Sequence, residues 1–187
     1  AEGAQSQNVE HRTVAVHDPS IVLAYEDAEG NTYHEAGEGR TKVYYVFGTQ
    51  IAQAKSYDLV NWTEFVSNLS DENTLFSVIP ESIRNYTGNT TAQALKENCW
   101  APDVIYNRAM GKWCMYLSVN GADYNSVIVL LVADTLDGAW SYMGEVVYSG
   151  IRSSNVASTD FEEVTGSNVV DNKYWVKRGS HLSYGVN

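Results

Sequence analysis

Two pairs of neighbouring aspartate and proline residues could do chemistry in this chain. Asp18-Pro19 lies near the N-terminus and Pro102-Asp103 in mid-chain, each at the start of a β-rich run. A carboxylate at such a place can act as a general base on water. Pro19 fixes its own φ and pushes Asp18 toward an extended conformation, from which the carboxylate would project at the start of an inner strand. The alternative is an aspartate that caps a turn, because Asp-Pro is a common turn pair.

The neighbours of these aspartates are candidates for binding a substrate. Trp100 has a flat apolar face that can stack on a sugar ring, and the alternative is a core tryptophan between two sheets. His17 could contact a sugar or hydrogen-bond the adjacent sheet. For Asp103, a hydrogen bond to the backbone competes with a role at the substrate. The candidate site therefore consists of Asp18 as general base, with His17, Trp100 and Asp103 as substrate-binding residues.

A degenerate internal repeat predicts the elements that position these residues. Residues 42–50 match residues 112–120, and residues 54–62 match residues 132–140. Each unit predicts short antiparallel strands that end in a turn into a tryptophan-containing outer strand. Short strands repeated at such a period are typical of propeller blades. A third unit is expected to begin near Asp160, with residues 174–177 as a strand or a substrate-side loop.

The two units are separated by an insertion at about residues 66–98. Within it, residues 91–97 predict a short helix capped by Thr91, and residues 85–90 predict a loop. A connection of this length is usually functional in a compact domain, so we expect it near the site. His34 lies in an acidic loop that we expect to be solvated.

Composition excludes several classes of function. The chain of 187 residues has a formal net charge of −11, which argues against nucleic-acid binding, because that needs clustered Lys and Arg. No apolar run approaches the roughly 18 residues of a membrane span. The first residue is Ala, which fits a chain trimmed after a signal peptide or trimmed in another way.

The two cysteines are expected to be buried thiols. A hairpin around residues 109–111 would place Ile105 opposite Cys114. Cys99 would then lie about six strand positions from Ile105, too far for a disulfide at roughly 3.3 Å per residue.

Together these segments resemble glycoside hydrolase family 43, and most of all its endo-arabinanases, over roughly residues 14–187. The segments that carry the resemblance are residues 17–21, 47–49, 56–62, 100–104 and 133–140. The resemblance implies an all-β, five-bladed β-propeller, of which this chain supplies about the first two blades and the start of a third. Residues 1–187 would then be the N-terminal part of one catalytic domain, with the remainder absent from this chain.

The resemblance also implies an inverting mechanism, in which one carboxylate activates water and a carboxylic acid protonates the leaving oxygen. Asp18 matches the family's base. The family's Asp in an Ile-Asp-Pro setting and its acidic Glu have no match here, and Asp103 is no substitute. We therefore expect a C-terminal fragment of the same enzyme as partner, and an isolated chain that is inactive.

The substrate implied is arabinan or an arabino-oligosaccharide, with no nucleic-acid or membrane partner, and the implied location is extracellular. A calcium ion in the central channel would take its ligands from outside this chain. The alternatives are an exo-acting arabinofuranosidase or β-xylosidase on the same scaffold, a carbohydrate-binding propeller without catalysis, and a purely structural fragment.

Overall fold

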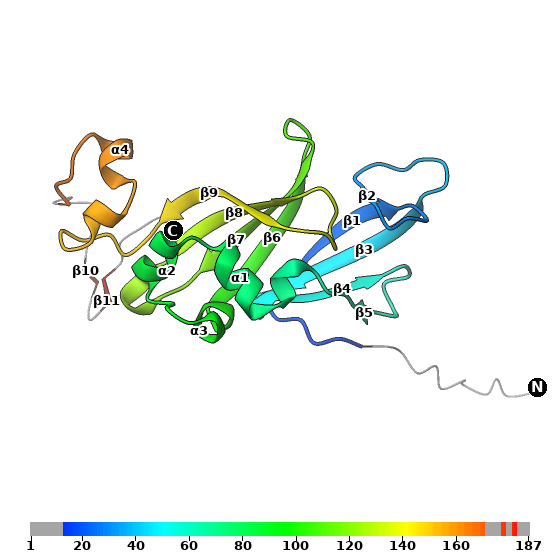
Figure 1. Cartoon of the computed structure of the whole chain (residues 1–187), viewed down its shortest axis with the longest axis horizontal. Helices are drawn as coiled ribbons and strands as arrows, with labels where there is room; N and C mark the ends of the chain where they lie inside the picture. Colours follow the sequence, from blue (N-terminus) through cyan, green and yellow to red (C-terminus); the bar gives the residue numbers. More distant parts are fainter. Residues whose placement is uncertain (1–12, 171–176, 179–180, 183–187) are drawn as a thin grey trace, which may run out of the picture.

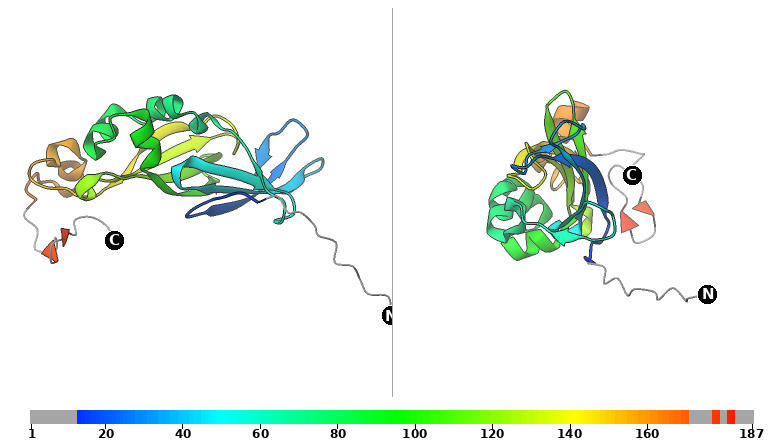
Figure 2. Two further views of the ribbon diagram at one scale, coloured as in Figure 1. Left: turned by 90° about the horizontal axis from the view of Figure 1, so that it is seen from below. Right: turned by 90° about the vertical axis from the view of Figure 1, so that its right-hand side faces the viewer.

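Two antiparallel sheets lie side by side along the molecule, and the helices of the insertion cover one side of them (Figures 1 and 2). The computed structural model describes residues 13–170, 177–178 and 181–182. Within these residues the sheets form no closed ring of blades. The fold is thus mainly sheet, as expected, with short helices added.

The first sheet has the strand order β2-β1-β3-β4-β5. Its strands are β1 (Ser20–Glu26), β2 (Thr32–Tyr33), β3 (Thr41–Gly48), β4 (Ala52–Ser56) and β5 (Thr63–Glu64). In β3, Val43, Tyr45 and Phe47 are buried at every second position, as expected for the core face of a strand. This face packs toward the second sheet, where Phe47 meets the ring of Trp140 edge-on at 5.9 Å.

The second sheet has the order β6-β7-β8-β9 and contains the predicted hairpin. Its strands are β6 (Cys99–Asn107), β7 (Lys112–Val119), β8 (Val127–Ala133) and β9 (Ser141–Tyr148). The predicted register is confirmed, because Ile105 pairs with Cys114. Cys99 and Cys114 are buried free thiols, as expected. Burial raises the pKa of Cys99 to about 12, so this thiol stays protonated at neutral pH.

The repeat of the sequence corresponds to β3–β5 and β7–β9. The prediction that each outer strand contains a tryptophan is wrong, because Trp62 and Trp140 each precede the outer strand. Trp140 is 1% exposed, and its indole Nε1 donates a hydrogen bond to the carbonyl of Leu136 at 3.2 Å. The turn before β9 therefore directs the indole into the core between the sheets.

The insertion is mainly helical. It contains η2 (Asn68–Ser70), α1 (Glu72–Val78), α2 (Glu81–Thr87) and α3 (Ala92–Glu97). The predicted helix is confirmed as α3, and the Thr91 hydroxyl accepts a hydrogen bond from the N–H of Ala94 at 3.2 Å. The predicted loop at residues 85–90 is wrong up to Thr87, because burial of Ile83 and Tyr86 supports α2. Gly88, at φ +77°, ends that helix.

The chain after β9 is where the sequence predicts a third unit to begin. It contains η4 (Val156–Ser158) and α4 (Phe161–Thr165), and further along the two-residue strands β10 (Lys177–Arg178) and β11 (His181–Leu182) pair with each other. The turn η3 (Ala122–Tyr124) lies earlier, between β7 and β8. A helix thus follows Asp160, the third unit stays a prediction, and most of the predicted strand or loop at residues 174–177 lies outside the described residues. Each described helix is too short or too polar to cross a membrane.

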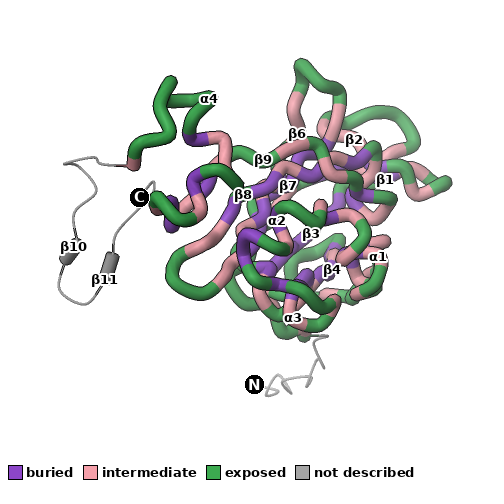
Figure 3. The backbone as a smooth tube through the Cα atoms, turned by 60° about the vertical axis from the view of Figure 1, so that its left-hand side comes forward, coloured by how far each residue is buried: buried purple, intermediate pink, exposed green. Residues whose placement is uncertain are grey.

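Buried positions occur along the strands of both sheets and in the insertion helices (Figure 3). A polar cluster joins the sheets within this core. Lys55 Nζ lies 2.7 Å from Glu26 Oε1 and 3.4 Å from Asp137 Oδ2, which belongs to the turn before β9. Burial opposes ionisation of Glu26, but hydrogen bonds from Lys55 and Tyr57 outweigh it, and the pKa of Glu26 is lowered. The cluster therefore holds a charged pair at the junction.

Replacing Lys55 by Ala should destabilise the protein by roughly 3 kcal/mol, because Glu26 would keep a buried charge without its partner. Lys112→Ala is the matched control, since its partner Asp134 is 81% exposed and such surface pairs contribute only about 0–1 kcal/mol. Urea denaturation of both variants measures the difference. Equal losses of stability would contradict the account.

Candidate active site

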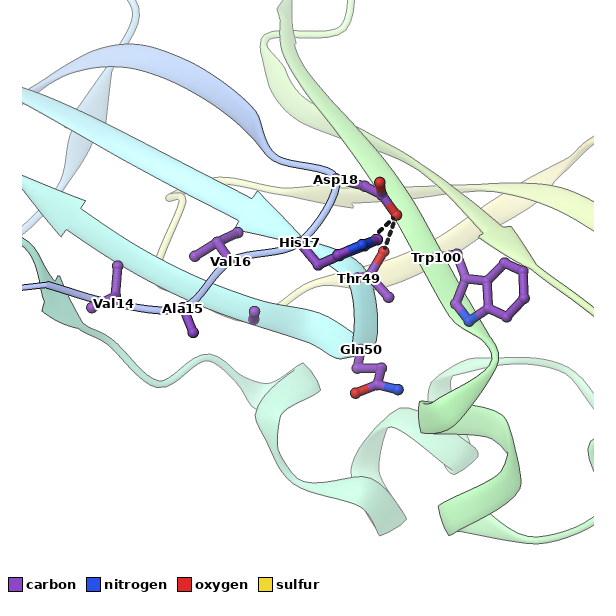
Figure 4. Close-up of a pocket in the computed structure, with 9 residues that line it drawn as sticks. Val14, Ala15, Val16, His17, Asp18, Thr49, Gln50 and Trp100 are labelled. Carbon is purple, nitrogen blue, oxygen red and sulfur yellow. Dashed lines mark hydrogen bonds and ion pairs between the residues drawn. The ribbon is translucent and has the colours of Figure 1, made fainter.

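Asp18 lies two residues before β1, and its carboxylate contacts the side chains of Thr49 and His17 (Figure 4). Thr49 Oγ1 donates a hydrogen bond to Asp18 Oδ2 at 2.9 Å, and His17 Nδ1 lies 2.8 Å from the same oxygen. The Asp18 side chain is nevertheless 48% exposed. It is thus held in place and accessible to water, as a general base must be.

The backbone of Asp18 differs from the sequence prediction. Its φ is +48°, in the left-handed region, and not extended as the following proline suggested. This backbone conformation is fixed by a contact outside the Asp18-Pro19 pair, because the N–H of Thr49 donates a hydrogen bond to the carbonyl of His17 at 2.9 Å. Aspartate is among the residues that tolerate this region best.

Gly48 allows the segment before Asp18 to cross closely over the end of β3. A Cβ atom at this position would lie 2.4 Å from Val16 Cγ1 and 2.6 Å from the carbonyl oxygen of His17. A larger residue would therefore push this segment away and move the Asp18 carboxylate.

The environment of Asp18 favours its ionised form. The hydrogen bond from Thr49 lowers the pKa of Asp18 below its usual 3.8, and contact with His17 adds to this, against the opposing effect of desolvation. At neutral pH Asp18 is thus a carboxylate that can accept a proton, and not an acid that can donate one.

Trp100 lies on the other side of the same cleft. Its side chain is exposed, so the core alternative is wrong, and its indole Nε1 donates to the carbonyl of Glu97 at 2.8 Å. The pairing of β6 with β7 shifts between Trp100 and Asp103, and Ala101 has φ +43°. This irregularity, of the β-bulge kind, redirects the side chain at the strand's start. The N–H of Ala101 donates to Thr49 Oγ1 at 3.1 Å, which ties Trp100 to the segment that holds Asp18.

Asp103 contacts a side chain of the first sheet. Ser20 Oγ donates to Asp103 Oδ1 at 2.8 Å and accepts from the N–H of Val104 at 3.2 Å. The predicted backbone hydrogen bond of Asp103 is therefore wrong: this carboxylate links the sheets through Ser20. Asp103 does not line the cleft beside Asp18.

The cleft has a volume of about 910 Å³ and opens beside the Asp18 carboxylate. It is lined by Val14, Ala15, Val16, His17, Asp18, Thr49, Gln50, Ala52 and Trp100. The structure thus brings together three of the four predicted site residues. Sequence reasoning missed Thr49 and Gln50 as site residues, although Thr49 ends one of the segments that carry the family resemblance.

His34 lies away from this cleft, at the start of a loop whose residues 35–39 are exposed, as expected. Its ring stacks on Tyr106 with a centroid distance of 3.8 Å, and Nε2 lies 3.2 Å from Glu35 Oε1. In the part of the chain that is described, no group of three or more His, Cys, Asp or Glu residues could hold a metal ion.

Replacing Thr49 by Val should raise the pKa of Asp18 toward its ordinary value, because the carboxylate loses the hydrogen bond that contributes most to lowering it. Thr49→Ser keeps the hydroxyl and should leave this pKa low. NMR titration of the Asp18 carboxyl carbon measures both variants. An unchanged pKa in Thr49→Val would show that the hydroxyl does not hold the carboxylate.

Comparison with known proteins finds endo-arabinanases among the relatives of this chain. No family model matches the chain. It is 29% identical over 179 residues to the extracellular endo-α-(1→5)-L-arabinanase 2 of Bacillus subtilis, covering 91% of this chain and 34% of the relative. It is 31% identical over 141 residues to the extracellular endo-α-(1→5)-L-arabinanase of Thermotoga petrophila, covering 74% of this chain and 26% of the relative. The chain therefore spans about a third or less of these relatives.

Solved structures give the same result. The endo-1,5-α-L-arabinanase of Thermotoga petrophila matches with a TM-score of 0.57 and 27% identity, over 77% of this chain and 28% of that protein. A glycoside hydrolase family 43 protein of Bacillus licheniformis matches with a TM-score of 0.51 and 32% identity, over 76% of this chain and 28% of that protein. The resemblance inferred from the sequence is thus confirmed: the chain is a relative of the endo-arabinanases of glycoside hydrolase family 43.

Proposed function

We propose that this chain provides the general base of an inverting glycosidase that cleaves α-1,5-linked L-arabinofuranosyl chains of arabinan. The observation that carries the proposal is an ionised, accessible Asp18 beside the exposed indole of Trp100 in one cleft. The names of both curated relatives support the substrate, the internal position of cleavage and an extracellular location.

Four residues of the cleft have a role in this mechanism. Asp18 accepts a proton from the water that attacks the anomeric carbon, while Thr49 and His17 hold the carboxylate toward that water. Trp100 offers its face to a sugar ring, fixed by the bond from its indole to Glu97. Asp103 supports this geometry from outside the cleft by linking the sheets through Ser20. A calcium ion, whose ligands would come from outside the chain, takes no part in these roles.

An inverting enzyme also needs a carboxylic acid that protonates the leaving oxygen, at roughly 6.5–9.5 Å from the base. We propose that this acid is supplied by a C-terminal fragment of the same enzyme, since Asp103 does not line the cleft. The chain would then be the N-terminal part of one catalytic domain and inactive by itself.

Exposed apolar residues on both sheets support completion of the fold by further sheets. Ile21 and Leu23 of β1 are 56% and 43% exposed, whereas Ser20, the first residue of the strand, contacts the second sheet. On the second sheet, Ile105 is 56% and Ile128 38% exposed. Apolar sheet faces are normally covered in soluble proteins. We propose that they are covered by the remaining blades of a five-bladed propeller.

Denaturing intact mass spectrometry of the active protein tests this completion. The expected result is a second polypeptide, or a single polypeptide longer than these 187 residues. A single species of only these residues that hydrolyses arabinan would show that no further fragment is needed.

Replacing Asp18 by Asn should lower the rate of arabinan hydrolysis by about 10²–10⁴-fold, because the amide cannot accept the proton. Affinity for arabino-oligosaccharides should change little, as the size of the side chain is kept. Asp134→Asn is the control, a surface carboxylate that is 81% exposed. The rate is measured as release of reducing ends from linear arabinan. A wild-type protein that includes the C-terminal part and still binds arabinan without cleaving it would instead identify a carbohydrate-binding propeller.

A further inference from the structure

A second, polar cavity lies beside the cleft, between the turn η1 (Thr49–Ile51) and the insertion helices. It has a volume of about 240 Å³ and is lined by Gln50, Glu72, Gln93, Lys96 and Glu97. At about 30 Å³ per water, this is on the order of eight water volumes, which suits one small sugar ring.

The polar cavity and the cleft share a residue. Gln50 lines both, and in Figure 4 its side chain extends from the turn after Thr49 toward the insertion helices. Glu97 connects them a second time, because its carbonyl accepts the hydrogen bond from the indole of Trp100 at 2.8 Å. A chain of sugar units that lies on Trp100 would therefore continue directly to Gln50 and α3.

The chemistry of the lining suits neutral hydroxyl groups. Gln50 and Gln93 carry amides that donate and accept, and the charges of Glu72, Lys96 and Glu97 leave a net of about −1, which disfavours an anion. Gln93 Nε2 donates to Glu97 Oε1 at 2.9 Å, and Lys96 Nζ lies 3.6 Å from Glu72 Oε1. The amide of Gln50 makes no hydrogen bond to any described residue, so it is available to a ligand.

We propose that the insertion gives this protein an additional subsite, in which Gln50 and Gln93 hydrogen-bond the hydroxyls of an arabinofuranosyl unit beyond the one on Trp100. The inference rests on the proposed function and adds a preference to it: substrates long enough to reach the polar cavity bind better than short ones.

The test compares linear α-1,5-arabino-oligosaccharides of two and six units on the purified protein as isolated, with any fragment that accompanies it. Gln93→Ala is well tolerated because Ala favours the helix and the side chain is exposed. Gln50→Asn shortens the amide and suits the left-handed backbone at φ +60°. Asn85→Ala, on the exposed side of α2, is the control within the same insertion.

Each Gln variant should lower kcat/KM and affinity for the six-unit substrate by about three- to tenfold, the effect of one lost hydrogen bond. Gln93→Ala should leave the two-unit substrate unchanged, whereas Gln50→Asn should affect it less than the six-unit substrate, because Gln50 also lines the cleft. The control should change neither. Unaltered selectivity for chain length in both Gln variants would overturn the subsite.

Failure of the subsite and failure of the proposed function give different results. Calorimetric binding to the wild-type protein is measured alongside hydrolysis. If the wild type cleaves arabinan but both Gln variants keep its selectivity, only the subsite is wrong. If the wild type neither binds nor cleaves either oligosaccharide, the proposed function fails, and the subsite fails with it.

Discussion

The hydroxyl of Thr49 is the interaction on which the geometry of this site depends. It donates to the Asp18 carboxylate and accepts from the N–H of Ala101, which follows Trp100 in the second sheet. A single hydroxyl therefore fixes the candidate base relative to the candidate sugar platform, although they come from different sheets. Gly48 permits the close crossing that brings Asp18 to this hydroxyl.

Two further contacts keep the sheets in register around that hydroxyl. Ser20 joins β1 to Asp103 and to the N–H of Val104, and the Lys55 cluster joins the first sheet to Asp137. Between them, the ring of Phe47 meets Trp140 edge-on in the core. Because these contacts are polar and directional, they add to apolar packing in holding one sheet in a single position against the other. The cleft is thus a product of the junction and not of either sheet alone.

Local sequence was enough to predict the strands of both sheets and the helix α3, but not the helices α1 and α2 or the details of the junction. The turn at residues 109–111 predicted the hairpin with its register, and Thr91 predicted the start of α3. The left-handed backbone of Asp18 was missed because it is fixed by Thr49, 31 residues away in sequence. The stacking of His34 on Tyr106 was missed for the same reason, since it depends on a contact between sheets.

The candidate site, like the fold, could be predicted only in part. His17, Asp18 and Trp100 were found from their types and neighbours, and they share one cleft. Thr49 and Gln50 gave no signal of their own, because a threonine or glutamine after a strand has many ordinary uses. Their roles become visible only in the folded structure, in which η1 contacts α3 and β6.

NMR titration with a linear α-1,5-arabino-oligosaccharide tests the central claim most directly. It follows the indole N–H of Trp100 and the carboxyl carbon of Asp18 in the labelled protein. We expect both signals to shift together and to saturate at the same oligosaccharide concentration. Shifts confined to other tryptophans, with Asp18 and Trp100 unchanged, would show that the sugar binds elsewhere and would contradict the account.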